Sequence, residues 1–173
     1  LWIQEAEETG EVAVDTETSS LDPHQADLVG ISLCSKIGKA CYIPIGHNSS
    51  KCINKDIVIK KLKPLLEDPS VKKIGQNIKF DFIVLFKNGI NIASMEDTML
   101  MSYVLDAGKN RHNMDTLSEI HLGHKTISFK EMVGTGKKEI NFSEVELDKA
   151  KDYAAEDADV TFRLYKKFIK NLK

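Results

Sequence analysis

The sequence predicts an α/β fold in which helices flank a mixed β-sheet. Three short apolar runs rich in β-branched residues lie near the N-terminus, at residues 11–18, 28–34 and 40–45. After residue 54, stretches with helical spacing alternate with short strand-like runs. We therefore expect a three-stranded antiparallel meander to which later strands add in parallel. The 173 residues are enough for one domain with a substantial core.

The N-terminal third is expected to supply one helix and the meander. Residues 1–8 are predicted to form a short helix that precedes the first strand. The second and third strands form a hairpin joined by residues 36–39. Pro44 has no backbone N–H to donate, so the third strand should lie at a sheet edge or end there.

The middle of the chain alternates helix and strand. Residues 54–67 have helical spacing, and Pro64 is expected to kink or split that helix. A short strand at residues 71–75 should lead into a helix with Asn77 as its N-cap.

A further strand is expected at residues 90–92, followed by a helix at 98–105. Between residues 107 and 142 the pattern loosens, and only residues 115–122 are predicted to be helical. The length of this glycine- and lysine-containing segment predicts a binding region or a mobile flap. A loop-rich basic surface is the alternative.

The last helix has the clearest start signal. Ser143 and Glu146 fit a capping box, and Phe142 and Leu147 fit the hydrophobic staple around it. We expect this helix to run to about Ile169.

The composition restricts the class of protein. No apolar run reaches the roughly 20 residues of a membrane span, and residues 1–10 lack a signal-peptide layout. We therefore expect a cytosolic protein without a membrane partner. The three cysteines, Cys34, Cys41 and Cys52, show no C-x-x-C spacing, so neither a disulfide framework nor a zinc site is expected.

The net charge of −2 argues against nucleic-acid binding through bulk positive charge alone. It does not exclude nucleic acid, because bound cations add charge that a sequence count omits.

Acidic residues end the first predicted strand. Asp15 and Glu17 are two positions apart, so a strand would place both on one face. An isolated pair of this kind most often forms a solvated acidic face. The other interpretation is a site for a divalent cation such as Mg²⁺, which prefers carboxylate oxygens.

Two further acidic positions stand out. Asp81 lies in the first turn of a predicted helix, where favourable interaction with the helix dipole would explain it. Tyr153 and Asp157 are four residues apart and share one face of the last helix. Each of these features alone could be an ordinary surface feature.

Taken together, Asp15-Thr16-Glu17, Asn77-x-x-x-Asp81 and Tyr153-x-x-x-Asp157 resemble the three motifs of the DEDDy class of 3′→5′ exonucleases. That class has a ribonuclease-H-like fold. The chain is more specifically similar to the proofreading domain of bacterial DNA polymerase I. The matching segments are residues 14–22, 28–30, 63–68, 75–77, 111–115, 124–127 and 153–161.

The resemblance implies that residues 1–173 form a single 3′→5′ exonuclease domain, a fragment of a larger protein with a polymerase domain after it. It implies a monomer in the bacterial cytosol, associated with the nucleoid. Its substrate would be the 3′ end of single-stranded or frayed DNA, and its product nucleoside 5′-monophosphates.

The resemblance also implies a site for two divalent metal ions, Mg²⁺ or Mn²⁺. Asp15 would bridge the ions, Glu17 and Asp157 would complete the first site, and Asp81 would hold the second. Tyr153 would orient the nucleophilic water together with Glu17. A phenol with a reference pKa of about 10 suits this role better than proton abstraction.

Substrate contacts follow from the same resemblance. Leu21 matches an apolar residue that wedges between terminal bases, and Phe129 matches one that packs on the substrate. Both could instead be ordinary core residues. Phe80 lacks the hydroxyl of the Tyr that relatives often have there. Further positions near the last nucleotides are Gln76, Asn77, Arg111 and Met114.

Two other functions are compatible with these motifs. A ribonuclease D-like 3′→5′ exoribonuclease has the same catalytic set. The other alternative is a catalytically idle domain that serves a polymerase as a structural or DNA-holding platform, although such a domain should lack metal-binding carboxylates.

Overall fold

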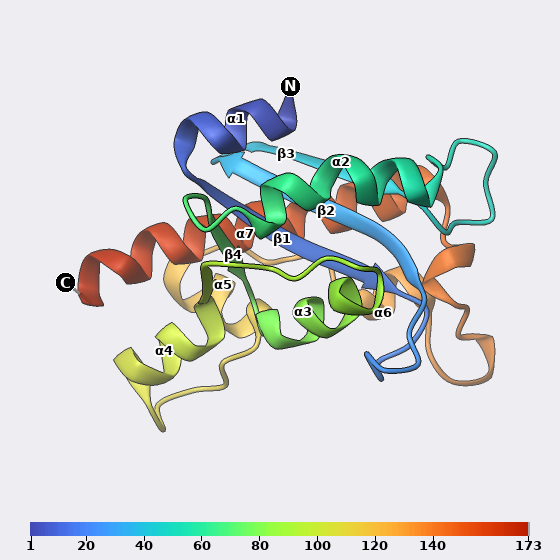
Figure 1. Cartoon of the computed structure of the whole chain (residues 1–173). Coiled ribbons are helices and arrows are strands. Elements are labelled where there is room, and N and C mark those ends of the chain that lie inside the picture. Colours follow the sequence, from blue (N-terminus) through green and yellow to red (C-terminus); the bar gives the residue numbers. More distant parts are fainter. Residues whose placement is uncertain (173) are drawn as a thin grey trace.

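The computed structural model describes residues 1–172 and has three layers, with a five-stranded sheet between two layers of helices (Figure 1). The strand order is β3-β2-β1-β4-β5. Strands β1, β2 and β3 are antiparallel, and β4 and β5 run parallel to β1. The predicted fold class is therefore confirmed. The strands are β1 Glu11–Thr18, β2 Leu28–Lys36, β3 Lys39–Pro44, β4 Lys72–Gly75 and β5 Met95–Asp97.

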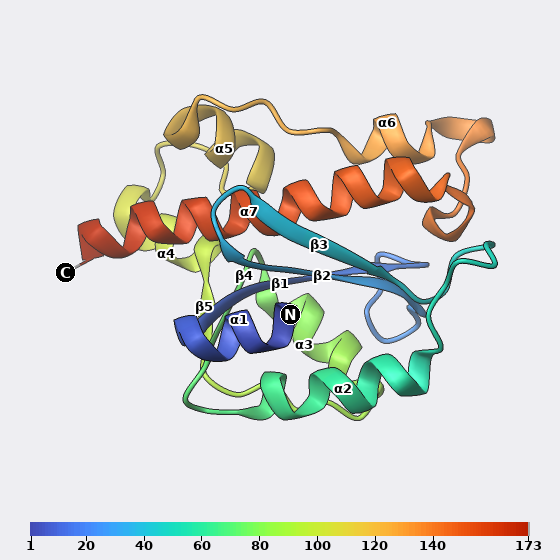
Figure 2. The same cartoon turned by 90° about the horizontal axis from the view of Figure 1, so that it is seen from above.

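Helices cover both faces of the sheet, as the view from above shows (Figure 2). One face carries α1 Trp2–Thr9, α2 Lys55–Glu67 and α3 Ile78–Lys87. The long helix α7 lies along the other face with the remaining elements. These are α4 Thr98–Asp106, α5 Met114–Leu122, α6 Phe129–Val133 and α7 Leu147–Leu172, with 3-10 turns η1 Gly136–Lys138 and η2 Phe142–Glu144.

The alternation of side chains along β1 divides the interior into two cores. Val14 belongs to the cluster shared with α1, α2 and α3, whereas its neighbour Ala13 belongs to the cluster under α7. The same period places Thr16 on the α3 side and directs Asp15 and Glu17 toward α7. The end of β1 thus presents polar side chains to the helices on both faces of the sheet.

Helix α2 runs through Pro64 without a break, so the predicted split is wrong. Its buried residues Leu62, Leu65 and Leu66 lie on both sides of the proline and pack in the same core. This packing outweighs the one backbone hydrogen bond that Pro64 cannot make.

The strand predicted at residues 90–92 is also wrong. Ile90 and Ile92 are buried, but the fifth strand begins later, at Met95. Ile90 and Ile92 are two positions apart and both pack in the core next to α2. This alternation of apolar residues resembles that of a strand although the segment is not one.

Asn77 precedes α3 as predicted, but its side chain does not cap the helix. Asn77 takes the N-cap position in a left-handed conformation, with φ 60°. The carboxylate of Asp97 accepts hydrogen bonds from the backbone N–H groups of Asn77 and Ile78 instead, at 2.9 and 3.2 Å. The cap therefore comes from the end of β5.

The predicted capping box at Ser143 and Glu146 is wrong, since α7 begins only at Leu147. The backbone of Val145 is extended, with ψ 138°, and interrupts any helix through this region. A capping box does form two residues earlier, where Asn141 and Glu144 cap η2. The buried side chain of Val145 fixes this interruption.

No helix in the part of the chain that the structure describes is long and apolar enough to cross a membrane.

Gly30 provides a test of the packing between strands. It pairs with Glu17 of β1, and the ring of Tyr42 lies over it from β3. A Cβ atom at position 30 would lie 2.1 Å from the Tyr42 hydroxyl oxygen, so the ring would have to move. We expect Gly30→Ala to lower the free energy of unfolding by about 1–3 kcal/mol, measured by urea denaturation.

The same substitution in a Tyr42→Ala background is the control. Without the ring, the three closest contacts of the added methyl group are gone, so the loss should be much smaller. Equal losses in both backgrounds would contradict this account of the packing.

Candidate active site

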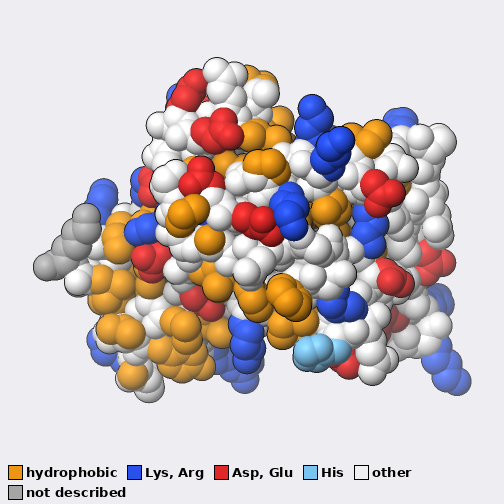
Figure 3. All heavy atoms as spheres, viewed as in Figure 1, with side chains coloured by type: hydrophobic (Ala, Val, Ile, Leu, Met, Phe, Trp, Pro, Cys, Tyr) orange, Lys and Arg blue, Asp and Glu red, His pale blue; other side chains and the backbone are white. Residues whose placement is uncertain are grey.

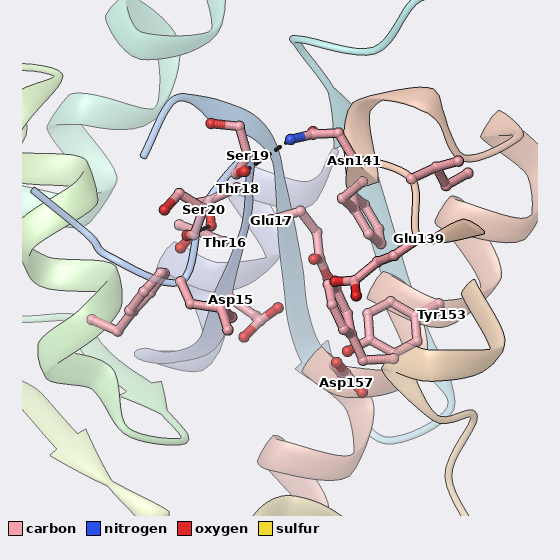
Figure 4. Close-up of a pocket in the computed structure, with 15 residues that line it drawn as sticks. Asp15, Thr16, Glu17, Thr18, Ser19, Ser20, Glu139, Asn141, Tyr153 and Asp157 are labelled. Atoms are coloured by element: carbon pink, nitrogen blue, oxygen red, sulfur yellow. Dashed lines mark hydrogen bonds between the residues drawn. The ribbon is translucent and has the colours of Figure 1, made fainter. Parts of the chain in front are cut away.

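Strand β1 and helix α7 bring three carboxylates together. Asp15 and Glu17 project from β1, and Asp157 projects from the helix that covers that face (Figure 4). One oxygen of each carboxylate lies within 4.8 Å of the others. The spacing of two on a strand and the packing of α7 therefore place the first and third predicted motifs in one cluster.

Asp81 reaches the same region from α3, on the other side of β1. Its Oδ1 accepts hydrogen bonds from the Thr16 backbone N–H at 2.9 Å and from the Thr16 hydroxyl at 2.6 Å. Asp81 is buried and lies outside the cluster of three, but its charge raises the pKa of Asp15 and of Glu17. Asp81 therefore lies close enough to Asp15 and Glu17 to interact electrostatically with both.

Burial and like charge make this cluster costly to ionise. Burial is the largest cause that raises the pKa of Asp15 and Glu17 well above the usual range, and neighbouring carboxylates add to it. Burial also raises the pKa of Asp157 to about 8, although the Tyr153 hydroxyl offsets part of this rise. The pKa of Asp81 is raised to about 7 despite its hydrogen bonds from Thr16.

The donor set fits a hard divalent cation. All its groups are carboxylates, oxygen ligands of the kind that Mg²⁺ prefers, and a cation would compensate their repulsion. On the face shown in Figure 3, basic and acidic side chains are interspersed.

Tyr153 lies one helical turn before Asp157, and its side chain points into the same space (Figure 4). Burial first, and then the charges of Asp157 and Glu17, raise its pKa above the ordinary value of 10. Its ring contacts the rings of Phe129 and Phe142, with centroids 6.3 and 5.8 Å apart. The phenol is therefore a fixed hydrogen-bond donor near neutral pH.

A cleft of about 710 Å³ opens over the cluster. Leu21 and Phe129, both predicted to contact substrate, line it together with Tyr153. The sequence had indicated a binding region or flap between residues 107 and 142, and part of this segment forms one wall. Lining residues that were not predicted as site residues are Thr16, Thr18, Ser19, Ser20, Phe80, Glu139, Ile140, Asn141 and Phe142.

Four predicted substrate residues do not line this cleft. Gln76 is tied to its surroundings, since its side-chain amide donates to the His112 carbonyl at 2.8 Å and accepts from the Thr98 hydroxyl at 2.5 Å. Asn77 is exposed, and so is Arg111. Met114 starts α5 and is half-buried against the core under α7. Substrate contacts from these four positions stay a prediction.

Comparison with solved structures supports the ribonuclease-H-like fold. A structure of Brucella melitensis NrnC with bound Mg²⁺ is 25% identical, with a TM-score of 0.72 over 94% of this chain and 73% of that one. Escherichia coli RNase D, an exoribonuclease, is 16% identical with a TM-score of 0.70 over 98% of this chain and 42% of that one. The second likeness shows the fold alone.

Sequence comparison assigns the family. Residues 1–173 match the family described as 3′–5′ exonuclease. DNA polymerase I of Rhizobium leguminosarum is 46% identical over 95% of this chain, and that of Pseudomonas aeruginosa is 45% identical over 95%. The chain spans only 18% and 19% of the length of these two relatives. It therefore belongs to the 3′–5′ exonuclease family and corresponds to the exonuclease domain of DNA polymerase I.

Proposed function

We propose that this chain hydrolyses the terminal phosphodiester at the 3′ end of single-stranded or frayed DNA and releases nucleoside 5′-monophosphates. The observation that carries the proposal is the cluster of half-buried Asp15 with buried Glu17 and Asp157, with Asp81 beside it, at an open cleft. Carboxylates packed this closely are stabilised in their ionised form by a compensating cation, and phosphodiester hydrolysis requires positive charge at the phosphate.

In this proposal the four acids hold two divalent ions, Mg²⁺ or Mn²⁺. Asp15 would be shared by both, Glu17 and Asp157 would complete the first site, and Asp81 would serve the second. Bound ions of this kind supply positive charge to the phosphate oxygens and lower the pKa of water. The hydrogen bonds from Thr16 fix Asp81 relative to β1, so the protein holds both halves of the site in one arrangement.

The remaining side chains would position the reactants. Tyr153 stays protonated, so it would donate a hydrogen bond to the attacking water while Glu17 accepts one. Leu21 and Phe129, which both line the cleft, would contact the terminal bases. Apolar contacts accept any base, as an editing enzyme requires.

The relatives are whole DNA polymerases, and this chain matches less than a fifth of each of the two compared above. We therefore propose that a covalently linked polymerase delivers frayed 3′ ends to the cleft. Proofreading would then be the biological use of the hydrolysis.

A second candidate is an exonuclease that acts on RNA or on short oligonucleotides. One similar solved structure, 26% identical with a TM-score of 0.71, is Brucella melitensis NrnC bound to pGG. The acid cluster is compatible with either substrate, because it acts on the phosphodiester that DNA and RNA share.

Asp15→Ala tests the carboxylate cluster. Loss of the shared ligand should reduce hydrolysis of a labelled single-stranded DNA in Mg²⁺ by well over about a hundredfold, because even partners outside a metal's own ligands cost up to that much. Asp152→Ala, on the exposed side of the same helix α7, is the matched control and should retain activity.

Circular dichroism should show that both variants keep the fold. An Asp15→Ala protein that degrades DNA at the normal rate would contradict the proposed site. Equal inactivity of the unmodified protein and of Asp15→Ala, at high protein concentration, would favour the idle platform.

Substrate class can be tested with matched oligonucleotides. We expect single-stranded DNA to be degraded faster than RNA of the same sequence, with nucleoside 5′-monophosphates as products, measured by gel electrophoresis and chromatography. A clear preference for RNA would select the second candidate.

The raised pKa values predict how metal binding depends on pH. Without metal, the folded protein binds more protons at these acids than the unfolded chain does, so its stability should fall as pH rises from about 4 to 8. Mg²⁺ binds the ionised form, so it should raise the melting temperature more at about pH 8 than at about pH 5.5.

The melting temperature is measured in EDTA and in Mg²⁺ at both pH values. Asp15→Asn removes one of the like charges, so it should melt higher than the unmodified protein in EDTA at about pH 8 and gain less from Mg²⁺. The same gain from Mg²⁺ at both pH values would contradict this account of the acids.

A further inference from the structure

The loop between β1 and β2 carries Leu21 at the rim of the cleft and is closed at its base. The Ser19 backbone N–H donates to the Asp27 carbonyl at 3.0 Å, and the Asp27 N–H donates to the Ser19 hydroxyl at 2.9 Å. Asn141, from the opposite wall of the cleft, donates its side-chain amide to the Ser19 carbonyl at 2.8 Å. These bonds fix the two ends of the loop but not its tip.

The tip is folded by Asp22. Its carbonyl accepts from the N–H groups of Gln25 at 3.1 Å and Ala26 at 2.9 Å, and its carboxylate accepts from the His24 N–H at 3.0 Å. In these bonds the residues after Asp22 take part only through their backbone N–H groups. The carbonyls of Pro23, His24 and Ala26 accept no hydrogen bond within this turn.

Lys87 supplies donors for these carbonyls. Its ammonium donates to the carbonyls of Pro23 at 3.3 Å, His24 at 2.6 Å and Ala26 at 3.0 Å. An ammonium has three N–H donors, so this one side chain matches all three carbonyls. A compact ammonium on a flexible stem suits such a point contact.

The position of Lys87 links the loop to the acid cluster. Lys87 is the last residue of α3, and Asp81 lies in the first turn of the same helix. Asp81 binds Thr16 just before the loop, while Lys87 binds the tip of the loop. One rigid helix thus holds the chain on both sides of Leu21.

Folding alone buries little of the Leu21 side chain. Its side chain is 86% exposed although it lines the cleft. An apolar side chain held in water beside a binding site gains burial only when a ligand arrives. If the loop were mobile, binding would also have to order it, and that cost would weaken the complex.

We propose that Lys87 is a positioning residue for the substrate's 3′ end. It holds the loop of residues 19–27 so that Leu21 projects into the cleft before substrate binds. It acts through the loop carbonyls, without touching DNA. This inference rests on the proposed function and extends it to a residue outside the cleft.

The kinetic test compares Lys87→Met with Lys87→Arg and with Lys61→Met. Methionine keeps the length of the side chain but donates no hydrogen bond, so KM for single-stranded DNA should rise by about three- to tenfold while kcat changes little. Lys87→Arg keeps charge and donors and should restore most of the loss. Lys61→Met removes the same charge from an exposed position on α2 and should leave KM unchanged.

A double-mutant cycle with Leu21→Ala separates positioning from direct attraction of phosphate. If Lys87 acts through Leu21, Lys87→Met should add little to the KM of Leu21→Ala. If Lys87 contacted a phosphate instead, the effects of the two substitutions on KM would add, and DNA binding by Lys87→Met would depend less on salt than binding by the unmodified protein. Additive effects would overturn the proposal.

Hydrogen exchange tests the loop independently of activity. The amides of Gln25 and Ala26 should exchange faster in Lys87→Met than in the unmodified protein, and those of the core strand β1 should not change. Unchanged exchange at the loop would overturn the proposal even in an active enzyme. Faster exchange in a protein that degrades neither DNA nor RNA would refute the proposed function while supporting the role of Lys87 in the loop.

Discussion

The constraint on which this structure depends is the repulsion among carboxylates that the fold buries together. Ionising neighbouring carboxylates inside a protein is unfavourable, and here three, two of them buried, have oxygens within 4.8 Å of one another. The hydrophobic packing of α7 against β1 and β2 provides the free energy that holds them in place. The fold thus keeps its most unfavourable charges next to an open cleft, where a cation and a phosphate can both arrive.

Sheet topology explains why residues far apart in sequence share this site. β1 is the central strand, with β2 antiparallel on one side and β4 parallel on the other. The parallel connection through β4 brings the start of α3 to the same end of the sheet at which β1 delivers its acids. Helix α7 then crosses that face. Each layer contributes part of the site. The sheet supplies Asp15 and Glu17, α3 supplies Asp81, and α7 supplies Tyr153 and Asp157.

The sequence predicted the features that local chemistry encodes. Strand periodicity placed Asp15 and Glu17 on one face, and the order of strands and helices indicated the mixed sheet. It misplaced features that depend on tertiary contacts. The box at Ser143 failed because buried Val145 extends the backbone. The cap of α3 comes from Asp97, twenty residues after Asn77, and no local pattern announces it. The residues that form the walls of the cleft were not predicted, for the same reason. They line the cleft because the fold brings distant segments of the chain together, and no local sequence pattern marks them.

The two hydrogen bonds between Thr16 and Asp81 have a geometric consequence. Thr16 is covalently bonded to Asp15 on one side and Glu17 on the other, and it is bound to α3 through both its backbone and its hydroxyl. The separation between the acids of β1 and the acid of α3 is therefore set by peptide bond lengths and two short contacts. Twisting of the sheet or sliding of α3 would carry both partners along together. The position of Asp81 relative to the two acids of β1 thus depends on contacts to one residue between them, and not on the packing of the whole domain alone.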